Sequence, residues 1–247
     1  MTAITFDATG KIVVGTDLSR RAGAAVDWAA ELAASRGWPL LIVAAVPEVP
    51  IPKRSRLFDA MATGDWPGHL HDSARHRLNE LRARVLATHP EVQVETHVEE
   101  GMPSWVLAQA SKTAKVVVVG ARGEHAPATV RALGGTADAV VAHAHGPVAV
   151  VTDLAHAVPG GPVVVGVDDS PEGHAALNLA GREAAARAVP LVAIHAWDLS
   201  PWMIGPMGGA GMVDPIPQRE ALTAMVEEFL APLRAEHPDL QTRAEVV

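Results

Sequence analysis

Hydrophobic residues in the first 150 positions form short aliphatic runs, separated by longer segments in which they recur every three or four positions. The runs at 39–46 and 116–119 are almost wholly aliphatic, which is typical of strands buried on both faces of a parallel sheet. Residues 20–35 instead follow helical spacing. Such alternation predicts an α/β domain with a parallel sheet, right-handed crossovers and helices on both faces.

The same pattern, followed from residue 11 to residue 152, predicts elements in the order βαβαβαβαβ. The predicted strands cover 11–16, 39–46, 92–98, 116–119 and 147–152. The predicted helices cover 20–35, 69–88, 101–113 and 136–145. Ser19 precedes the first helix as an N-cap, and Ser170-Pro171 provides an N-cap and a first helical residue later in the chain.

The beginning of this pattern recurs in the second part of the chain. Residues 11–19 match 162–170, each position 151 residues further on. His89-Pro90 returns as His237-Pro238 at an offset of 148, which indicates one shorter loop. Two matches in nearly one frame indicate a second copy of the same domain.

The second copy is expected to contain strand, helix, strand, long loop, helix and strand, without a counterpart of residues 100–152. We therefore expect a complete domain over 8–153 and an incomplete one over 162–247. Its first strand, 163–167, should be an exposed apolar edge, which favours aggregation unless it is covered. On this interpretation the sequence is a fragment, or the second copy is poorly stable alone.

Composition and charge narrow the classes of function. Apolar residues make up 49% of the chain and charged residues 19%, as in globular proteins. The net charge of −8 argues against non-specific nucleic-acid binding. The absence of Cys excludes disulfides and thiolate metal sites, and favours a reducing compartment. With no signal-peptide pattern and no membrane-spanning apolar stretch, we expect a cytoplasmic protein without nucleic-acid or membrane partners.

Glycines and polar residues gather where the predicted strands end. In open doubly wound sheets, ligands bind at the carboxyl ends of the strands, where strand order reverses. Glycines admit phosphate oxygens to backbone N–H groups, and a helix N-terminus attracts anions. The alternative is that these glycines only form turns and that Asp17 only caps its loop. The candidate binding residues are Gly15, Thr16, Asp17, Ala45, Gly120, Arg122, Gly123, Gly134, Gly135 and Thr136.

Other clusters of polar residues have a simpler interpretation. His69 and His71, like His143 and His145, stand two positions apart and point to different helix faces, so surface positions are expected instead of metal ligands.

Two further segments are expected at the surface. Glu99 and Glu100 are predicted to lie on a solvated face, and the loop 202–217 to cover the strand ends. No nucleophile–His–acid arrangement, Walker A lysine motif or zinc spacing is present, so no catalytic residue is assigned.

These motifs together resemble the universal stress protein family. The matching pieces are Val-Gly-x-Asp-x-Ser over 14–19, Gly101-x-Pro103 before a helix, and Gly-x2-Gly over 120–123 followed by Gly134 and a helix. His195-Ala196-Trp197 resembles the second-strand end of actinobacterial tandem members. The resemblance covers nearly the whole chain.

The resemblance implies an open doubly wound, five-stranded parallel sheet of order 3-2-1-4-5, of the adenine nucleotide alpha hydrolase-like type. It also implies ATP, with or without Mg²⁺, bound through Gly-x2-Gly-x9-Gly-Ser/Thr. Asp17 would lie beside the adenosine, the backbone of Ala45 at the adenine, and the glycines with Arg122 around the ribose and phosphates. Here the spacer has ten residues and Thr136 stands one position late, which leaves ATP binding open.

Two classes of function remain. The first is an ATP-binding regulatory protein of stress responses, with at most slow hydrolysis. The second is an interaction module that works by dimerisation without a nucleotide, and the family implies a homodimer through the last strand, 147–152. A related hydrolase is disfavoured because a Ser-Gly-Gly-x-Asp-Ser loop is absent. The second copy keeps Asp168 and Ala196 but no glycine loop, so at most one nucleotide site is expected per chain.

Overall fold

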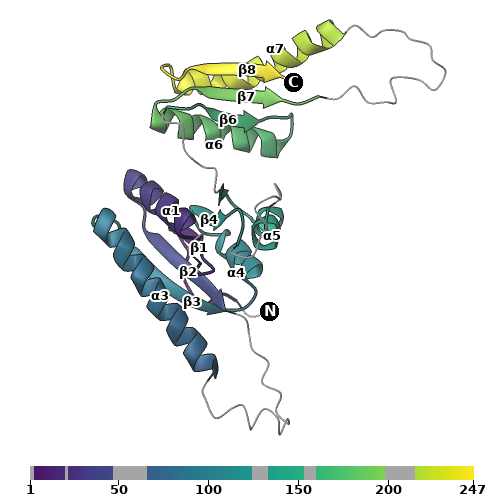
Figure 1. The fold of residues 1–247 in the computed structure, drawn as a ribbon. Coiled ribbons are helices and arrows are strands. Elements are labelled where there is room, and N and C mark those ends of the chain that lie inside the picture. The colour runs from purple at the N-terminus through teal and green to yellow at the C-terminus, as the bar shows by residue number, and fades with distance from the viewer. Residues whose placement is uncertain (1–2, 20–21, 47–65, 124–132, 153–159, 198–214) are drawn as a thin grey trace, which may run out of the picture. The chain divides into compact units, whose positions relative to one another are not determined.

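The computed structural model divides the chain into two compact units, Met1–His156 (unit 1) and Ala157–Val247 (unit 2), which are described separately (Figure 1). The structure describes residues 3–19, 22–46, 66–123, 133–152, 160–197 and 215–247. The predicted covering loop at 202–217 therefore lies outside the described residues, apart from 215–217, which open a helix.

Unit 1 contains a parallel five-stranded sheet in the order β3-β2-β1-β4-β5, as the family resemblance implied. Every predicted strand is present, and its ends lie within about two residues of those expected from the aliphatic runs. The strands are β1 (Ile12–Gly15), β2 (Leu40–Val46), β3 (Val94–Glu100), β4 (Val116–Gly120) and β5 (Val148–Val151).

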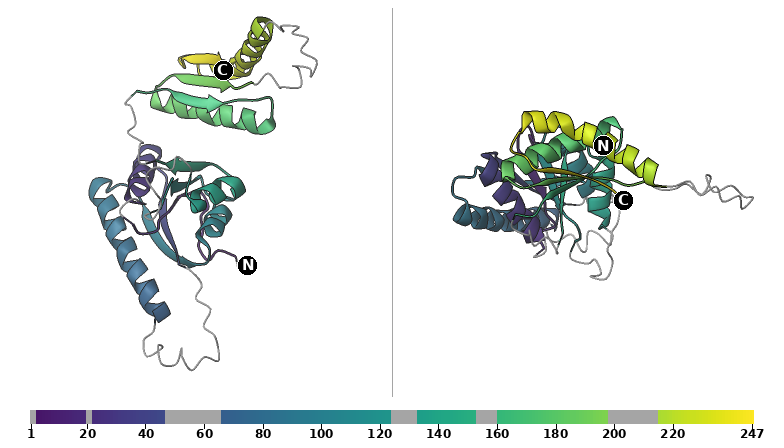
Figure 2. Two further views of the ribbon diagram at one scale, coloured as in Figure 1. Left: turned by 45° about the vertical axis from the view of Figure 1, so that its right-hand side comes forward. Right: turned by 90° about the horizontal axis from the view of Figure 1, so that it is seen from above.

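Helices cover both faces of this sheet. Helices α1 and α3 pack on one face, and α4 and α5 on the other (Figure 2). They are α1 (Ala22–Arg36), α3 (Trp66–Thr88), α4 (Pro103–Ala110) and α5 (Gly135–His143). The predicted helices are confirmed, although α3 begins earlier than the predicted residue 69 and α4 ends before the predicted residue 113.

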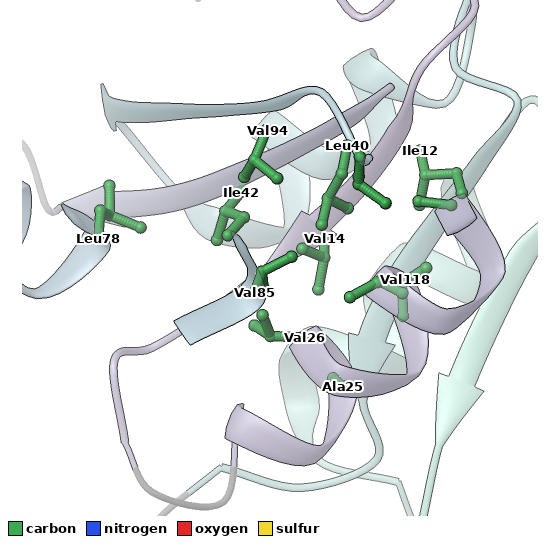
Figure 3. Close-up of a cluster of buried hydrophobic side chains, with 14 of the residues drawn as sticks. Ile12, Val14, Ala25, Val26, Leu40, Ile42, Leu78, Val85, Val94 and Val118 are labelled. Atoms are coloured by element: carbon green, nitrogen blue, oxygen red, sulfur yellow. The ribbon is translucent and has the colours of Figure 1, made fainter. Parts of the chain in front are cut away.

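Aliphatic side chains of alternate strand residues build two cores, one on each face of the sheet. On the face of α1 and α3, Ile12, Val14 and Ile42 are fully buried (Figure 3). Ala25 of α1 is equally buried, and its small side chain lets the helix approach the strands closely. Each fully buried Val, Leu or Ile contributes about 1.5–3 kcal/mol. The strands are thereby held in place beneath the loops at their carboxyl ends.

Unit 2 repeats the first part of this arrangement. Its parallel three-stranded sheet has the order β6-β7-β8, and Val163 pairs with Leu191 as Ile12 pairs with Leu40 in unit 1. Helices α6 and α7 share one hydrophobic core with the sheet. The elements are β6 (Val163–Gly166), α6 (Pro171–Arg187), β7 (Leu191–His195), α7 (Pro215–Glu236) and β8 (Thr242–Val246).

The second sheet is incomplete compared with the first, and β6 forms its edge, as predicted. Only part of that edge is exposed, however. Val164 is 57% exposed, whereas Val165 and Val167 are buried against α6 and α7.

Both predicted helix caps are present. The Ser19 Oγ atom accepts the N–H of Ala22 at 3.2 Å, and the Ser170 Oγ atom accepts the N–H of Gly173 at 3.0 Å. Each serine thus satisfies a backbone donor that the first helical turn leaves without a partner.

Candidate functional site

A cavity of about 360 Å³ lies at the carboxyl ends of β1, β2 and β4 in unit 1. Strand order reverses at β1, which is where ligands of doubly wound sheets bind. The cavity is lined by all the candidate residues named from the sequence, namely Gly15, Thr16, Asp17, Ala45, Gly120, Arg122, Gly123, Gly134, Gly135 and Thr136. Val43, Pro103 and Leu107 add apolar surface.

The glycine-rich segments after β4 and before α5 lie against each other. The Gly134 N–H donates to the Ala121 carbonyl oxygen at 2.8 Å. A Cβ atom on Gly134 would lie 3.4 Å from that oxygen and 3.4 Å from the Arg122 Cα atom, at the short limit of ordinary van der Waals contact. Glycine therefore leaves the two backbones room to approach closely at this position.

The N-terminus of α5 opens on the cavity. Gly134 is its N-cap residue, and no side chain there accepts a backbone N–H. The first residues of the helix, Gly135, Thr136 and Ala137, line the cavity with it. Uncapped N–H groups and the positive end of the helix dipole make this end of the cavity suited to an anion.

Thr136 stands one position later than the family pattern expects, and the structure describes this residue but not most of the spacer before it. Gly135 and Thr136 both belong to the first turn of α5 and both line the cavity. Most of the ten-residue spacer, 124–132, lies outside the described residues.

The β1–α1 loop brings a carboxylate next to one of these glycine segments. Asp17 is exposed, and its Oδ1 atom accepts the Ser19 N–H at 3.0 Å. Its Oδ2 atom lies 3.1 Å from the position that a Cβ atom of Gly123 would take. The carboxylate therefore borders the glycine segment as well as the cavity.

The expectation that Glu99 is solvated was wrong. Glu99 pairs with Ala45 across β3 and β2 and is only 5% exposed. The Thr5 hydroxyl donates to its Oε2 atom at 2.6 Å, and His97 Nε2 lies 2.8 Å from the same oxygen. Ile4 and Phe6 of the N-terminal segment pack into the core of the same unit, so this segment covers β3.

A second residue that the sequence did not single out is Arg77 of α3. Its Nη1 atom donates to the Leu18 carbonyl oxygen at 3.1 Å, in the loop that carries Asp17. No local pattern indicates this contact, because the two residues are 59 positions apart.

The equivalent loop of unit 2 carries Asp168 but no glycine segment accompanies it among the described residues. Two hydrogen bonds from Ser170 hold the pKa of Asp168 below its ordinary value. The larger effect comes from the Ser170 hydroxyl and the smaller one from the Ser170 amide. A larger hollow of about 530 Å³ lies instead at the opposite ends of the unit 2 strands, between the C-termini of α6 and α7. Helix C-termini repel anions, and Glu236 and Asp239 line that hollow, so it does not suit a nucleotide.

The remaining polar clusters behave as surface groups. His71 Nε2 lies 2.9 Å from Glu100 Oε1, and His143 Nδ1 lies 2.8 Å from the Ala139 carbonyl oxygen. Among the described residues, no group of three or more His, Asp or Glu side chains is arranged to hold a metal ion. Within the same part of the chain, no helix combines the length and the hydropathy needed to cross a membrane.

The chain is similar to several known proteins. The model of the universal stress protein family matches residues 9–152 and 161–247. A universal stress protein of Mycolicibacterium smegmatis is 31% identical, over 95% of this chain and 78% of that protein. One from Mycobacterium tuberculosis is 35% identical over 77% of this chain, and the match spans only 64% of that relative. A universal stress protein structure from Archaeoglobus fulgidus aligns with 98% of this chain and 80% of its own, at 16% identity and a TM-score of 0.62, which shows a shared fold. The chain belongs to the universal stress protein family.

Proposed function

We propose that unit 1 binds an adenine nucleotide, with ATP as the expected ligand, in the cavity at the ends of β1, β2 and β4. The observation that carries the proposal is the convergence of all the sequence-derived candidates on one cavity beside the uncapped N-terminus of α5. Its volume of about 360 Å³ falls in the range of small-molecule sites. Regulation of a stress response in the cytoplasm is the setting that family membership suggests.

The two ends of the cavity suit the two ends of a nucleotide. Gly134, Gly135 and Thr136 present backbone N–H groups to phosphate oxygens. Pro103, which is exposed, offers apolar surface to a base, next to the backbone of Ala45 at the end of β2. We expect the phosphates at α5 and the nucleoside at β2, with Asp17 between them.

Nucleotide binding with slow turnover is the expected behaviour. The described lining residues include one carboxylate, Asp17, and no His, Glu or Lys. Phosphate oxygens and water would therefore supply most ligands of an accompanying Mg²⁺. No lining side chain is placed as a general base for hydrolysis, so we expect a regulatory binding protein instead of an ATPase.

Gly135→Asp tests the phosphate end of the site. A Cβ atom on Gly135 would meet nothing within 4 Å. A carboxylate at the start of α5 also interacts favourably with the positive end of the helix dipole, so the variant should keep the stability of the fold. The same carboxylate would repel phosphate. We expect Mg-ATP at a hundred times its Kd to stabilise the wild type by about 2.7 kcal/mol in thermal melting, and the variant hardly at all.

Gly135→Ala is the matched control, because it adds a side chain without charge and should keep most of the ATP response. No response of the wild type to millimolar Mg-ATP would overturn the proposed function. Equal responses of Gly135→Asp and wild type would place the phosphates elsewhere.

A second candidate function, a dimerising module, rests on the position of β5. This strand forms the edge of the unit 1 sheet, and no described strand pairs with its outer side. An exposed strand edge offers unpaired N–H and C=O groups to another chain. We expect a homodimer through β5, to be checked by sedimentation equilibrium over a wide concentration range; a monomer throughout would contradict it.

A further inference from the structure

The loop between β1 and α1 contains a strained residue next to the cavity. Leu18 has φ +62°, in the left-handed region that glycine adopts readily. A side chain with a Cβ atom costs about 1–2 kcal/mol in this conformation. Such a conformation persists only where the surrounding structure holds it, and strained residues of this kind cluster at functional sites. Leu18 itself does not line the cavity.

Three contacts hold Leu18 in this conformation. Its N–H donates to the Thr16 Oγ1 atom at 3.0 Å, and its carbonyl oxygen accepts from Arg77 Nη1 at 3.1 Å. Its side chain packs against the hydrophobic core on the side of α1 and α3. Leu78 anchors α3 in that same core and so fixes the backbone from which the exposed Arg77 side chain reaches Leu18. We call Thr16, Leu18 and Arg77 the brace.

The brace holds the residues on either side of Asp17. Thr16 precedes it and is only 8% exposed, and Leu18 follows it, so both of its peptide neighbours are held. The Asp17 carboxylate then reaches the Ser19 N–H with one oxygen and borders Gly123 with the other. The brace therefore holds the backbone on both sides of this carboxylate.

Unit 2 provides an internal comparison, because its equivalent loop lacks every part of the brace. The offsets of 151 and 148 place Val167, Asp169 and Met225 where the brace has Thr16, Leu18 and Arg77. Val167 has no hydroxyl, Met225 no donor, and Asp169 no left-handed backbone. The brace thus occurs in the unit that has the cavity and the glycine segments.

We infer that Arg77 and Leu18 are positioning residues for nucleotide binding: they hold Asp17 toward the nucleoside part of the ligand without touching the ligand. This inference rests on the proposed function of the cavity. It adds that the affinity for the nucleotide depends on the Arg77 guanidinium group of α3, which lies outside the cavity. Arg77 affects this affinity only by positioning Asp17.

The test compares Arg77→Ala with Arg75→Ala in the full chain. Both arginines are exposed on α3, but within the described part of the chain Arg75 forms an ion pair with Asp72 of its own helix, at 3.5 Å, and no hydrogen bond to the β1–α1 loop. We expect Arg77→Ala to weaken ATP binding about tenfold, the effect of losing one charged hydrogen bond, and Arg75→Ala to leave it unchanged. Affinity for inorganic tripolyphosphate, which engages α5 but has no nucleoside, should not change in either variant.

A double-mutant cycle separates positioning from a general structural effect. If Arg77 acts through Asp17, Arg77→Ala should have no further effect on ATP affinity in an Asp17→Asn background. Additive losses, or an equal loss of tripolyphosphate binding, would overturn the inference.

Amide hydrogen exchange without nucleotide tests whether Arg77 holds the β1–α1 loop, independently of any ligand. The Leu18 and Ser19 amides should exchange faster in Arg77→Ala than in wild type or Arg75→Ala, because their acceptors on Thr16 and Asp17 lose their fixed positions. Unchanged exchange would overturn the brace. If exchange responds as expected but the wild type binds no nucleotide, then the proposed function fails, and with it the role of the brace in affinity.

Discussion

Two residues of the chain other than glycine adopt a left-handed backbone among the described positions, Leu18 and Ala188. Leu18 is held by contacts from three sides, but Ala188 ends a helix. It follows α6 with φ +52°, in the position that Gly37 occupies after α1 with φ +64°. In both copies the next residue, Val189 or Trp38, donates its N–H to a helix carbonyl oxygen at 3.1 Å. This is the geometry of a helix C-cap, in which glycine is preferred.

Ala188→Gly should therefore stabilise unit 2. The substitution removes the Cβ strain of the left-handed conformation, and we expect a gain of about 1 kcal/mol in the free energy of unfolding. Ala176→Gly, inside α6 and equally exposed, is the matched control and should cost about 1 kcal/mol. Urea unfolding followed by a probe in unit 2 measures both; a loss of stability in Ala188→Gly would show that the cap does not constrain this helix end.

At the scale of single elements, the sequence was most informative where one local requirement decides the structure. Strands such as β2 and β4 are buried on both faces, so their aliphatic runs predict them almost to the residue. Helix starts followed from Ser19 and Ser170 because a hydroxyl cap is a local interaction. The candidate site could be predicted for the same reason, since residues at the carboxyl ends of parallel strands must meet.

Elements whose limits depend on distant contacts were less predictable. Helix α4 ends at Ala110 instead of 113, and its C-cap residue contacts a distant segment. The Ser111 Oγ atom donates to the Ala108 carbonyl oxygen and accepts the N–H of His145, 34 positions away. Glu99 is buried because Thr5, 94 positions earlier, covers it. Arg77 reaches Leu18 across 59 positions. None of these pairings leaves a periodic signal in the residues around it.

At the scale of the whole molecule, equivalent strand residues of the two units differ in how deeply they are buried. Val13, Leu41 and Val43 of unit 1 are buried under α4 and α5. The equivalent residues of unit 2 are Val164, Val192 and Ile194, and none belongs to its core. Val13 is 0% exposed and Val164 57%, although both are valines at equivalent strand positions. Burial of a valine side chain is worth about 1.5–3 kcal/mol, so unit 2 forgoes stabilisation that unit 1 has.

The two environments predict different protection of equivalent amides. In β6 the Val163 and Val167 N–H groups donate toward β7, to the carbonyl oxygens of Pro190 and Ile194 at 2.9 Å. Alternation along a parallel strand directs the Val164 N–H to the outer edge, where no described strand accepts it. In unit 1 the equivalent Val13 lies between β2 and β4.

We therefore expect the Val164 amide to exchange its hydrogen orders of magnitude faster than the Val13 amide in native-state NMR exchange. Val165 is the control within the same strand, because its N–H faces β7 and it should exchange slowly whenever the unit 2 sheet is folded. If Val164 and Val165 both exchange fast, the unit 2 sheet itself opens readily. If both are slow, another chain pairs with β6 in solution, and the exposed edge is an interface. Fast exchange at Val164 alone would establish that the edge stays open while the core of α6, α7 and the sheet holds unit 2 together.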